Sequence, residues 1–144
     1  MEAPKLLIVE ARFYDDLADA LVAGAVAEIE KRGATYERVA VPGVLEIPAV
    51  VRYGIGQYDG FVALGCVIRG ETTHYDTVCN ESARGLMDLS LKYQLALGNG
   101  IQTVENGDQA WARVSVDKMN KGGGAAAAAL DMIDVKRKLH VSLR

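Results

Sequence analysis

Hydrophobic and polar residues follow one another along the chain in blocks that predict alternating strands and helices. Apolar runs over 6–9 and 61–68 are typical of strands buried inside a sheet, and only Gly65 interrupts the second run. The segments 36–41 and 100–104 mix polar with apolar residues, as expected of strands at the two edges of a sheet. The pattern therefore predicts four strands, two of them central and two at the edges.

The segments between these strands have the spacing of amphipathic helices. Over 15–32, apolar residues recur every four positions and charged residues occupy the other face, before Gly33 ends the helix. Further helices are predicted from Pro48 to about 54–56 and over 75–96, 107–114 and 123–138. Because strands alternate with helices and crossovers are right-handed, we expect the strands to be parallel.

The polarity of the strands also predicts their order in the sheet. With the first and third strands central and the other two at the edges, the order is 2-1-3-4, as in flavodoxin-like folds. We expect an α/β protein with three layers, α/β/α, a four-stranded parallel sheet and one domain over 1–144. Ligands of such sheets bind beyond the carboxyl ends of the strands, so the turns that follow each strand hold the candidate residues.

The composition excludes several classes of protein. Sixteen basic and nineteen acidic residues give a net charge of −3, without the basic excess of a nucleic-acid-binding protein. No apolar run approaches the ~18 residues that cross a bilayer, so neither a membrane nor a nucleic acid is expected as a partner. Cys66 and Cys79 lack the spacing of a metal site or of a disulfide framework. We expect a cytoplasmic protein that binds no metal.

The turn after the third strand nearly matches a nucleotide-binding P-loop. Gly65, Gly70 and Thr72 have the spacing of that motif. Glu71, however, occupies the position of the lysine and would repel phosphates, which excludes a nucleoside triphosphatase. The backbone N–H groups of 70–73 could still bind one phosphate group at the start of a helix. The same residues also fit an ordinary turn capped by threonine.

Three other side chains near the predicted rim have useful chemistry. His74 could move protons near neutral pH, or could simply cap a helix. Glu46 could accept hydrogen bonds from a polyol, or favour the dipole of a helix. Phe13 offers an aromatic face for stacking or for packing. Arg113 and Lys121 have no evident partner at helical spacing, and could be solvated or bind an anion on a neighbouring chain.

Several motifs together resemble the lumazine synthase family of riboflavin biosynthesis. The longest is ALGCVIRGETTHYD, over 63–76. Further matches in the same order extend the resemblance over nearly the whole chain: Arg12–Phe13, Gly43–Pro48, Gln109–Arg113 and Asn120–Gly122. The resemblance implies a transferase without cofactor or metal. It would condense 5-amino-6-(D-ribitylamino)uracil with 3,4-dihydroxy-2-butanone 4-phosphate to 6,7-dimethyl-8-ribityllumazine, releasing phosphate and water.

The resemblance also implies a role for each candidate residue. Proton transfer would be carried out by His74. The implied phosphate site consists of backbone groups at the start of a helix and one cation from the adjacent subunit: Gly70, Glu71, Thr72, Thr73 and Arg113. The implied pyrimidine site consists of one stacking ring and two main-chain positions: Phe13, Val67 and Ile68. The implied ribityl site consists of a carboxylate, two main-chain positions and a lysine from across the interface: Glu46, Val44, Leu45 and Lys121.

Three positions depart from the family pattern. Asn99 stands where many members have an aromatic residue that covers the heterocycle, and Leu45 replaces a frequent aromatic. Gly124 stands where many members carry an acid. The resemblance therefore implies weaker contacts between Asn99 and the bound substrate than in those members, with the catalytic motif intact.

The family also implies an assembly. Its members are homopentamers with active sites between subunits, and some build hollow icosahedral shells. The short segment before the first strand and the joint at 115–119, which is not glycine-rich, favour a free pentamer or a pair of pentamers. Two alternatives remain open at this point. One is an archaeal-type riboflavin synthase, which needs no phosphate site, and the other is a non-catalytic protein that binds or carries lumazine or flavin.

Overall fold

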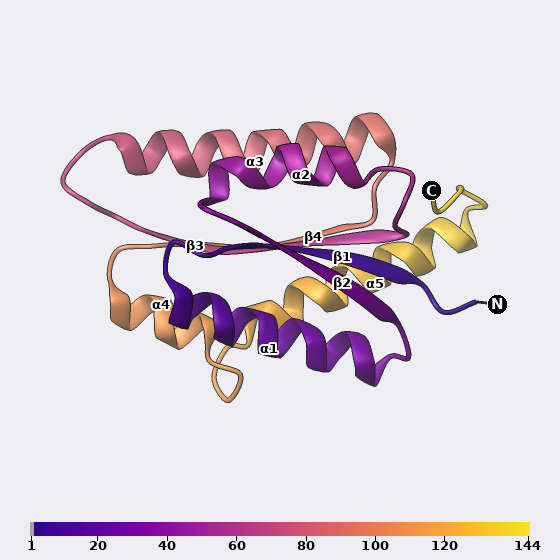
Figure 1. Cartoon of the computed structure of the whole chain (residues 1–144), viewed down its shortest axis with the longest axis horizontal. Helices are drawn as coiled ribbons and strands as arrows, with labels where there is room; N and C mark the ends of the chain where they lie inside the picture. Colours follow the sequence, from indigo (N-terminus) through magenta and orange to yellow (C-terminus); the bar gives the residue numbers. More distant parts are fainter. Residues whose placement is uncertain (1) are drawn as a thin grey trace.

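A four-stranded parallel sheet forms the centre of the computed structural model, which describes residues 2–144 (Figure 1). Its strands are β1 (Lys5–Ala11), β2 (Thr35–Val41), β3 (Gly60–Ile68) and β4 (Leu97–Val104). Their order is β2-β1-β3-β4, and each neighbouring pair is parallel. The fold class and strand order predicted from the polarity of the strands are confirmed.

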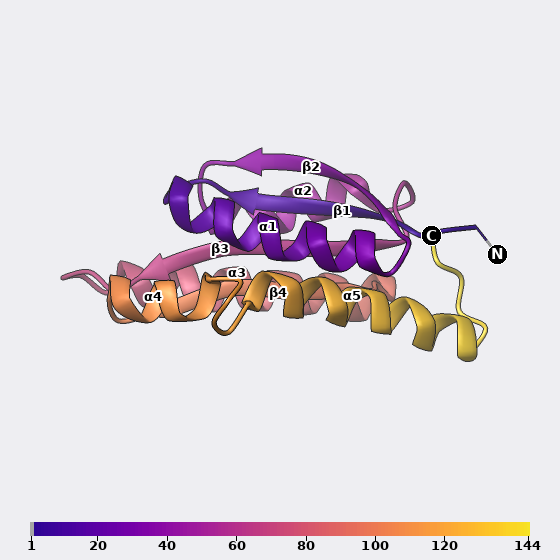
Figure 2. The same cartoon turned by 90° about the horizontal axis from the view of Figure 1, so that it is seen from below.

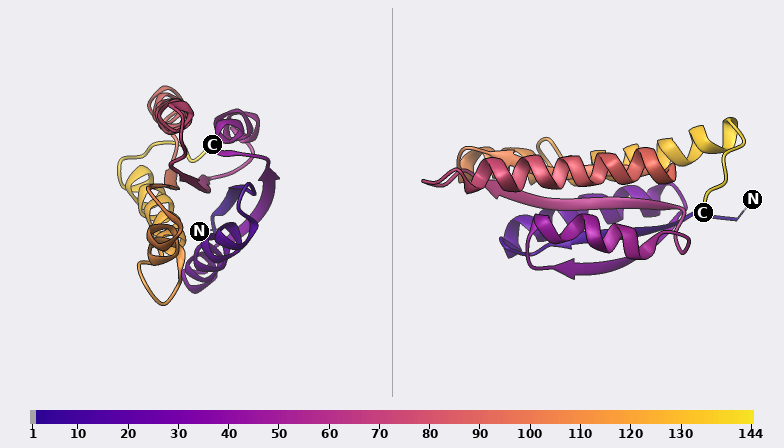
Figure 3. Two further views of the ribbon diagram at one scale, coloured as in Figure 1. Left: turned by 90° about the vertical axis from the view of Figure 1, so that its left-hand side faces the viewer. Right: turned by 90° about the horizontal axis from the view of Figure 1, so that it is seen from above.

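Helices cover both faces of this sheet (Figures 2 and 3). One face carries α1 (Asp15–Lys31), α4 (Gly107–Val114) and α5 (Lys121–Lys138), and the other carries α2 (Ile47–Gly54) and α3 (His74–Tyr93). A single 3₁₀ turn over Val44–Glu46 precedes α2. The five helices and the sheet make the three layers expected from the sequence.

The alternation of side chains along β1 divides the core into two apolar clusters. Leu6 and Ile8 point toward α1 and α5, whereas Leu7 and Val9 point toward α2 and α3. Strand β3 pairs with both β1 and β4, and its residues 60–66 are buried. Its continuous apolar run is the pattern that burial on both faces of a parallel sheet requires.

The predicted end of the third helix is wrong by three residues. The segment 75–96 was expected to be helical throughout, but α3 ends at Tyr93. The next residue, Gln94, adopts a left-handed conformation with φ of 55°, which stops the helix and turns the chain toward β4.

Strand β4 begins at Leu97, three residues before the predicted start at Gly100. Its glycines are needed for contact with α5, because a Cβ atom on Gly98 would lie 1.8 Å from the carbonyl oxygen of Ala125. The glycine at the start of β4 therefore allows close packing against Ala125 of α5, which lies far away in the sequence.

The carboxyl ends of the four strands meet at one end of the sheet, opposite the described chain ends (Figure 1). At that end, 69–73 lead from β3 into α3, while 12–14 and 42–46 follow β1 and β2. Within residues 2–144, no helix is long and apolar enough to cross a membrane.

Candidate active site

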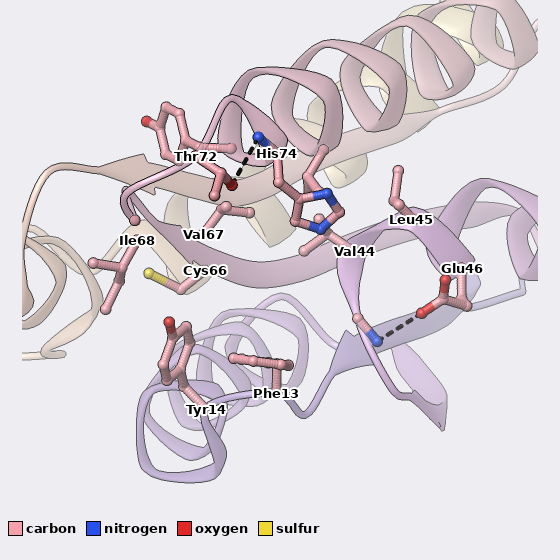
Figure 4. Close-up of a pocket in the computed structure, with 14 residues that line it drawn as sticks. Phe13, Tyr14, Val44, Leu45, Glu46, Cys66, Val67, Ile68, Thr72 and His74 are labelled. Atoms are coloured by element: carbon pink, nitrogen blue, oxygen red, sulfur yellow. Dashed lines mark hydrogen bonds between the residues drawn. The ribbon is translucent and has the colours of Figure 1, made fainter.

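A cavity of about 390 Å³ opens at the carboxyl ends of β1 and β3 (Figure 4). Its walls come from the turns after β1, β2 and β3 and from the first turns of α3. Fourteen residues line it: Phe13, Tyr14, Gly43, Val44, Leu45, Glu46, Cys66, Val67, Ile68, Gly70, Thr72, His74, Tyr75 and Val78. Most of the site residues predicted from the sequence therefore line this one cavity.

His74 is the first residue of α3, and its imidazole points into the cavity (Figure 4). Its backbone N–H donates a hydrogen bond to Oγ1 of Thr72 at 3.2 Å. The threonine thereby satisfies one of the free N–H groups at the start of the helix. This contact holds the backbone of His74 at the edge of the cavity and leaves the imidazole directed at its interior.

The turn between β3 and α3 has free backbone donors. Arg69 N–H donates to the carbonyl of Val104 at 2.9 Å, and the carbonyl of Thr73 accepts from the N–H groups of α3. Within the described chain, the N–H groups of 70–73 donate no hydrogen bond to protein. A Cβ atom on Gly70 would meet no atom within 4 Å, so open space surrounds this part of the turn. Free N–H groups at the start of a long helix are suited to an anion.

Glu46 closes the 3₁₀ turn after β2 and also faces the cavity. Its Oε1 accepts a hydrogen bond from the backbone N–H of Gly43 at 2.9 Å (Figure 4). This bond fixes the carboxylate beside the main chain of Val44 and Leu45, which also line the cavity. The carboxylate is solvent-exposed and can accept further hydrogen bonds from a ligand.

Phe13 provides an exposed aromatic ring at the rim. The ring is 74% exposed and packs edge-to-face on Tyr14, with the ring centroids 4.9 Å apart and the planes at 78°. An apolar ring that is held on one edge and otherwise open to solvent is available for stacking on a planar ligand.

Sequence reasoning missed five cavity residues: Tyr14, Gly43, Cys66, Tyr75 and Val78. Each lies within a few residues of a predicted candidate, so adjacency in a turn or on a helix face was the available signal. Burial raises the pKa of the Cys66 thiol to about 11, although the positive charge of Arg113 opposes this effect. The thiol is therefore protonated at neutral pH and contributes an uncharged wall.

Five predicted site residues do not line this cavity within the described chain: Glu71, Thr73, Asn99, Arg113 and Lys121. The first two belong to the 70–73 turn, where the expected contact is made by backbone. The other three lie elsewhere. Arg113 donates from Nη1 to the carbonyl of Gln109 at 3.2 Å, and Asn99 accepts at Oδ1 from Ile101 N–H at 2.9 Å. Residues 2–144 contain no cluster of three or more histidine, cysteine or acidic side chains suited to a metal ion.

Comparison with known proteins places this site in a family. A family model described as 6,7-dimethyl-8-ribityllumazine synthase matches residues 3–137. The chain is 58% identical to the protein of that name from Agrobacterium fabrum strain C58, with 96% of this chain and 99% of that protein covered. The chain belongs to the 6,7-dimethyl-8-ribityllumazine synthase family.

Other lumazine synthases are similar over comparable lengths. The 6,7-dimethyl-8-ribityllumazine synthase 1 of Rhizobium meliloti strain 1021 is 58% identical, over 93% of this chain and 92% of that protein. The enzyme of that family name from Afipia carboxidovorans strain OM5 is 55% identical, over 94% and 87%. The resemblance inferred from motifs is therefore confirmed. A riboflavin synthase of archaeal type or a non-catalytic carrier is not favoured, because these relatives are named as lumazine synthases.

Proposed function

We propose that this chain catalyses the lumazine synthase reaction in the cavity of Figure 4. The enzyme would condense 5-amino-6-(D-ribitylamino)uracil with 3,4-dihydroxy-2-butanone 4-phosphate to 6,7-dimethyl-8-ribityllumazine, with loss of phosphate and water. One observation carries this proposal most directly. A single cavity is bordered by a stacking ring, a carboxylate, an imidazole and a turn with free N–H groups, which are groups that these two substrates need.

The pyrimidine would stack on Phe13 and bind the main chain of Val67 and Ile68. The pairing of β1 with β3 stops at Leu64, whereas the pairing of β3 with β4 continues to Ile68. Beyond Leu64, the edge of β3 that faces the cavity therefore has backbone groups without a partner strand. Such groups match the alternating donors and acceptors on the edge of a uracil ring.

The ribityl chain would lie along the 3₁₀ turn at Val44–Glu46. The Glu46 carboxylate is already oriented by Gly43 N–H, which reduces the entropy lost when it binds a hydroxyl group. Backbone groups of Val44 and Leu45 would bind further hydroxyls, and Lys121 would approach from a neighbouring subunit.

The butanone phosphate would bind at the 70–73 turn through backbone N–H groups. Four donors at the start of a 20-residue helix provide partial positive charge without a lysine at position 71. We propose that Arg113 of an adjacent subunit closes over the phosphate and forms charge-assisted hydrogen bonds.

His74 would transfer the protons that the reaction requires. Imine formation between amine and ketone, elimination of phosphate and ring closure each move a proton, and imidazole can donate and accept near neutral pH. Holding both substrates in one geometry can itself lower the barrier by several kcal/mol, on the order of 7–11 for ideal alignment. The proposal therefore involves no cofactor and no metal.

We further propose a cytoplasmic, single-domain protein over 1–144 that assembles into pentamers with active sites between subunits. Large apolar side chains on the outer layer of α2 and α3 support self-association: Tyr53, Met87 and Leu91 are 72%, 60% and 73% exposed. The three predicted residues outside the cavity, Asn99, Arg113 and Lys121, would then belong to a neighbour's site.

The test is incubation of the purified chain with both substrates, followed by the absorbance of the lumazine product. Product formation at a rate that saturates with each substrate supports the proposal. Binding of the ribitylaminouracil or of lumazine without any turnover would instead favour a carrier protein on the same fold.

A further inference from the structure

The turn over 70–73 is held only from its two ends. Its own N–H groups make no hydrogen bonds to protein within the described chain, and its glycine lies in open space. Free donors are available to a ligand, but the hydrogen bond from His74 N–H to Oγ1 of Thr72 anchors only the helix end of the turn. Some group outside the turn must set its shape if the donors are to converge on one anion.

Arg69 makes the contacts that join the two ends. Its guanidinium lies over the ring of Tyr75, 4.3 Å from the ring centroid, which links the residue before the turn to the first turn of α3. Its Nη1 lies 3.8 Å from Oδ1 of Asp76 on the same helix. Its Nε forms an ion pair with Oε2 of Glu105 at 2.8 Å, just beyond the end of β4.

One planar side chain therefore connects β3, α3 and the end of β4 around the turn. A guanidinium can stack on a ring and bind carboxylates in its own plane at the same time, which the ammonium of lysine cannot do. Tyr75 itself lines the cavity, so the stacked pair also fixes one wall of the site.

We propose that Arg69 is a positioning residue that sets the 70–73 turn in the shape that binds the substrate phosphate. This inference rests on the proposed function of that turn. Arg69 acts through the backbone and does not bind the phosphate itself, because its guanidinium is shared between two carboxylates and does not line the cavity.

The test compares three substitutions in the assembled protein. Arg69→Gln removes the stacked charge, Arg69→Lys keeps the charge without the planar group, and Glu105→Gln removes one partner. The matched control is Arg84→Gln, because Arg84 lies on the surface of α3, away from the turn, and like Arg69 pairs with two carboxylates, Glu81 at 2.8 Å and Asp88 at 3.0 Å. Two quantities are measured for each protein: the KM of both substrates with kcat, and the Kd of inorganic phosphate by calorimetry.

For Arg69→Gln we expect the KM of the butanone phosphate and the Kd of inorganic phosphate to rise about tenfold, from loss of the stacked cation and ion pairs. The KM of the pyrimidine should change by less than about twofold, since its proposed contacts lie in the turns after β1 and β2 and at the end of β3. Arg69→Lys should recover part of the loss, Glu105→Gln should show a smaller rise, and Arg84→Gln should match the wild type.

The inference is overturned if Arg69→Gln leaves phosphate affinity unchanged, or if it raises both KM values equally as a general loss of structure would. It is also overturned if the wild type does not bind phosphate at all. If the wild type binds phosphate but forms no product, the proposed function fails, and the ratio of phosphate Kd values still decides the role of Arg69.

Discussion

Glu10 of β1 and Arg38 of β2 form a two-point ion pair across neighbouring strands. Arg38 donates from Nε to Oε2 and from Nη2 to Oε1, both at 2.8 Å. Glu10 is only 3% exposed, and its Oε1 also accepts from Nη1 of Arg12 at 3.1 Å. Arg12 in turn pairs with Asp15 and Asp19 of α1. A buried carboxylate is thus neutralised by two arginines beside the turn that carries Phe13.

Removing one arginine should leave this carboxylate poorly compensated. We expect Arg38→Met to lower the free energy of unfolding by about 2 kcal/mol, because a buried charge that loses a partner is strongly disfavoured while Arg12 still compensates in part. Urea unfolding at fixed protein concentration measures the change. Arg84→Met, which removes an exposed arginine from α3, should change stability by less than about 0.5 kcal/mol. Equal effects from the two variants would contradict the role assigned to Glu10.

Gly98 should not tolerate a side chain. Its Cβ would lie 1.8 Å from the carbonyl oxygen of Ala125, so Gly98→Ala must push α5 away from β4. We expect a loss of about 3 kcal/mol or more, or no soluble protein. Gly124→Ala is the matched change within α5, where the new Cβ meets nothing within 4 Å. That variant should gain about 0.5–1 kcal/mol from helix propensity. Retention of wild-type stability by Gly98→Ala would show that α5 and β4 do not pack as described.

Phe13 should affect binding far more than stability. Because the ring is 74% exposed, Phe13→Ala should lower the free energy of unfolding by less than about 1 kcal/mol. Loss of the stacking face should raise the KM of the ribitylaminouracil about tenfold or more. Phe13→Tyr keeps the ring and should retain a KM near the wild-type value. Steady-state kinetics with each substrate varied in turn separate the effects, and an equal rise in both KM values would argue against stacking.

The thiol of Cys66 should react slowly despite lining the cavity. Burial raises its pKa to about 11, so the reactive thiolate is scarce at pH 8, and its fraction should grow roughly tenfold per pH unit up to about pH 11. Alkylation by iodoacetamide, followed residue by residue with mass spectrometry, measures this. The urea-unfolded chain is the reference and should react at pH 8 at the rate of an ordinary cysteine. Equal rates for the folded and unfolded chains at pH 8 would show that Cys66 is neither buried nor shifted.

Sites shared between subunits should allow complementation. His74→Asn and Arg113→Ala should each be nearly inactive alone. In mixed oligomers formed by co-expression in equal amounts, about one site in four would combine His74 of one subunit with Arg113 of another, if neighbours assemble at random. We therefore expect activity near a quarter of the wild-type value. Mixed oligomers as inactive as the parent variants would place Arg113 and His74 in the same subunit's site.

The arrangement of the sheet could be predicted because it depends on local polarity. The mixed composition of the segments 36–41 and 100–104 placed them at the edges, and the apolar run 61–68 placed the third strand at the centre, as the structure confirms. The burial of the Glu10 side chain could not be predicted from the sequence. Its burial depends on Arg38, which lies 28 residues away in the sequence.

The sequence predicts those site residues whose position depends only on the turn directly after a strand. His74, Glu46 and Phe13 follow directly from the positions of the strands that precede them, and the structure brings all three to one cavity. Tyr75 was missed because its importance comes from Arg69, which stacks on it from the other side of the turn. The places of Arg113 and Lys121 depend on contacts between subunits, so their roles stay predictions.

The most direct test of the proposed function is the turnover of the two substrates by the wild type and by Arg113→Ala, followed by the absorbance of the lumazine product. We expect the wild type to form lumazine. The variant should lose most activity at low concentrations of butanone phosphate and regain part of it at high concentrations, because the missing cation lowers affinity for the phosphate. A wild type that binds the ribitylaminouracil but forms no lumazine would contradict the proposed function. A variant as active as the wild type at low butanone phosphate would contradict the phosphate contact assigned to Arg113.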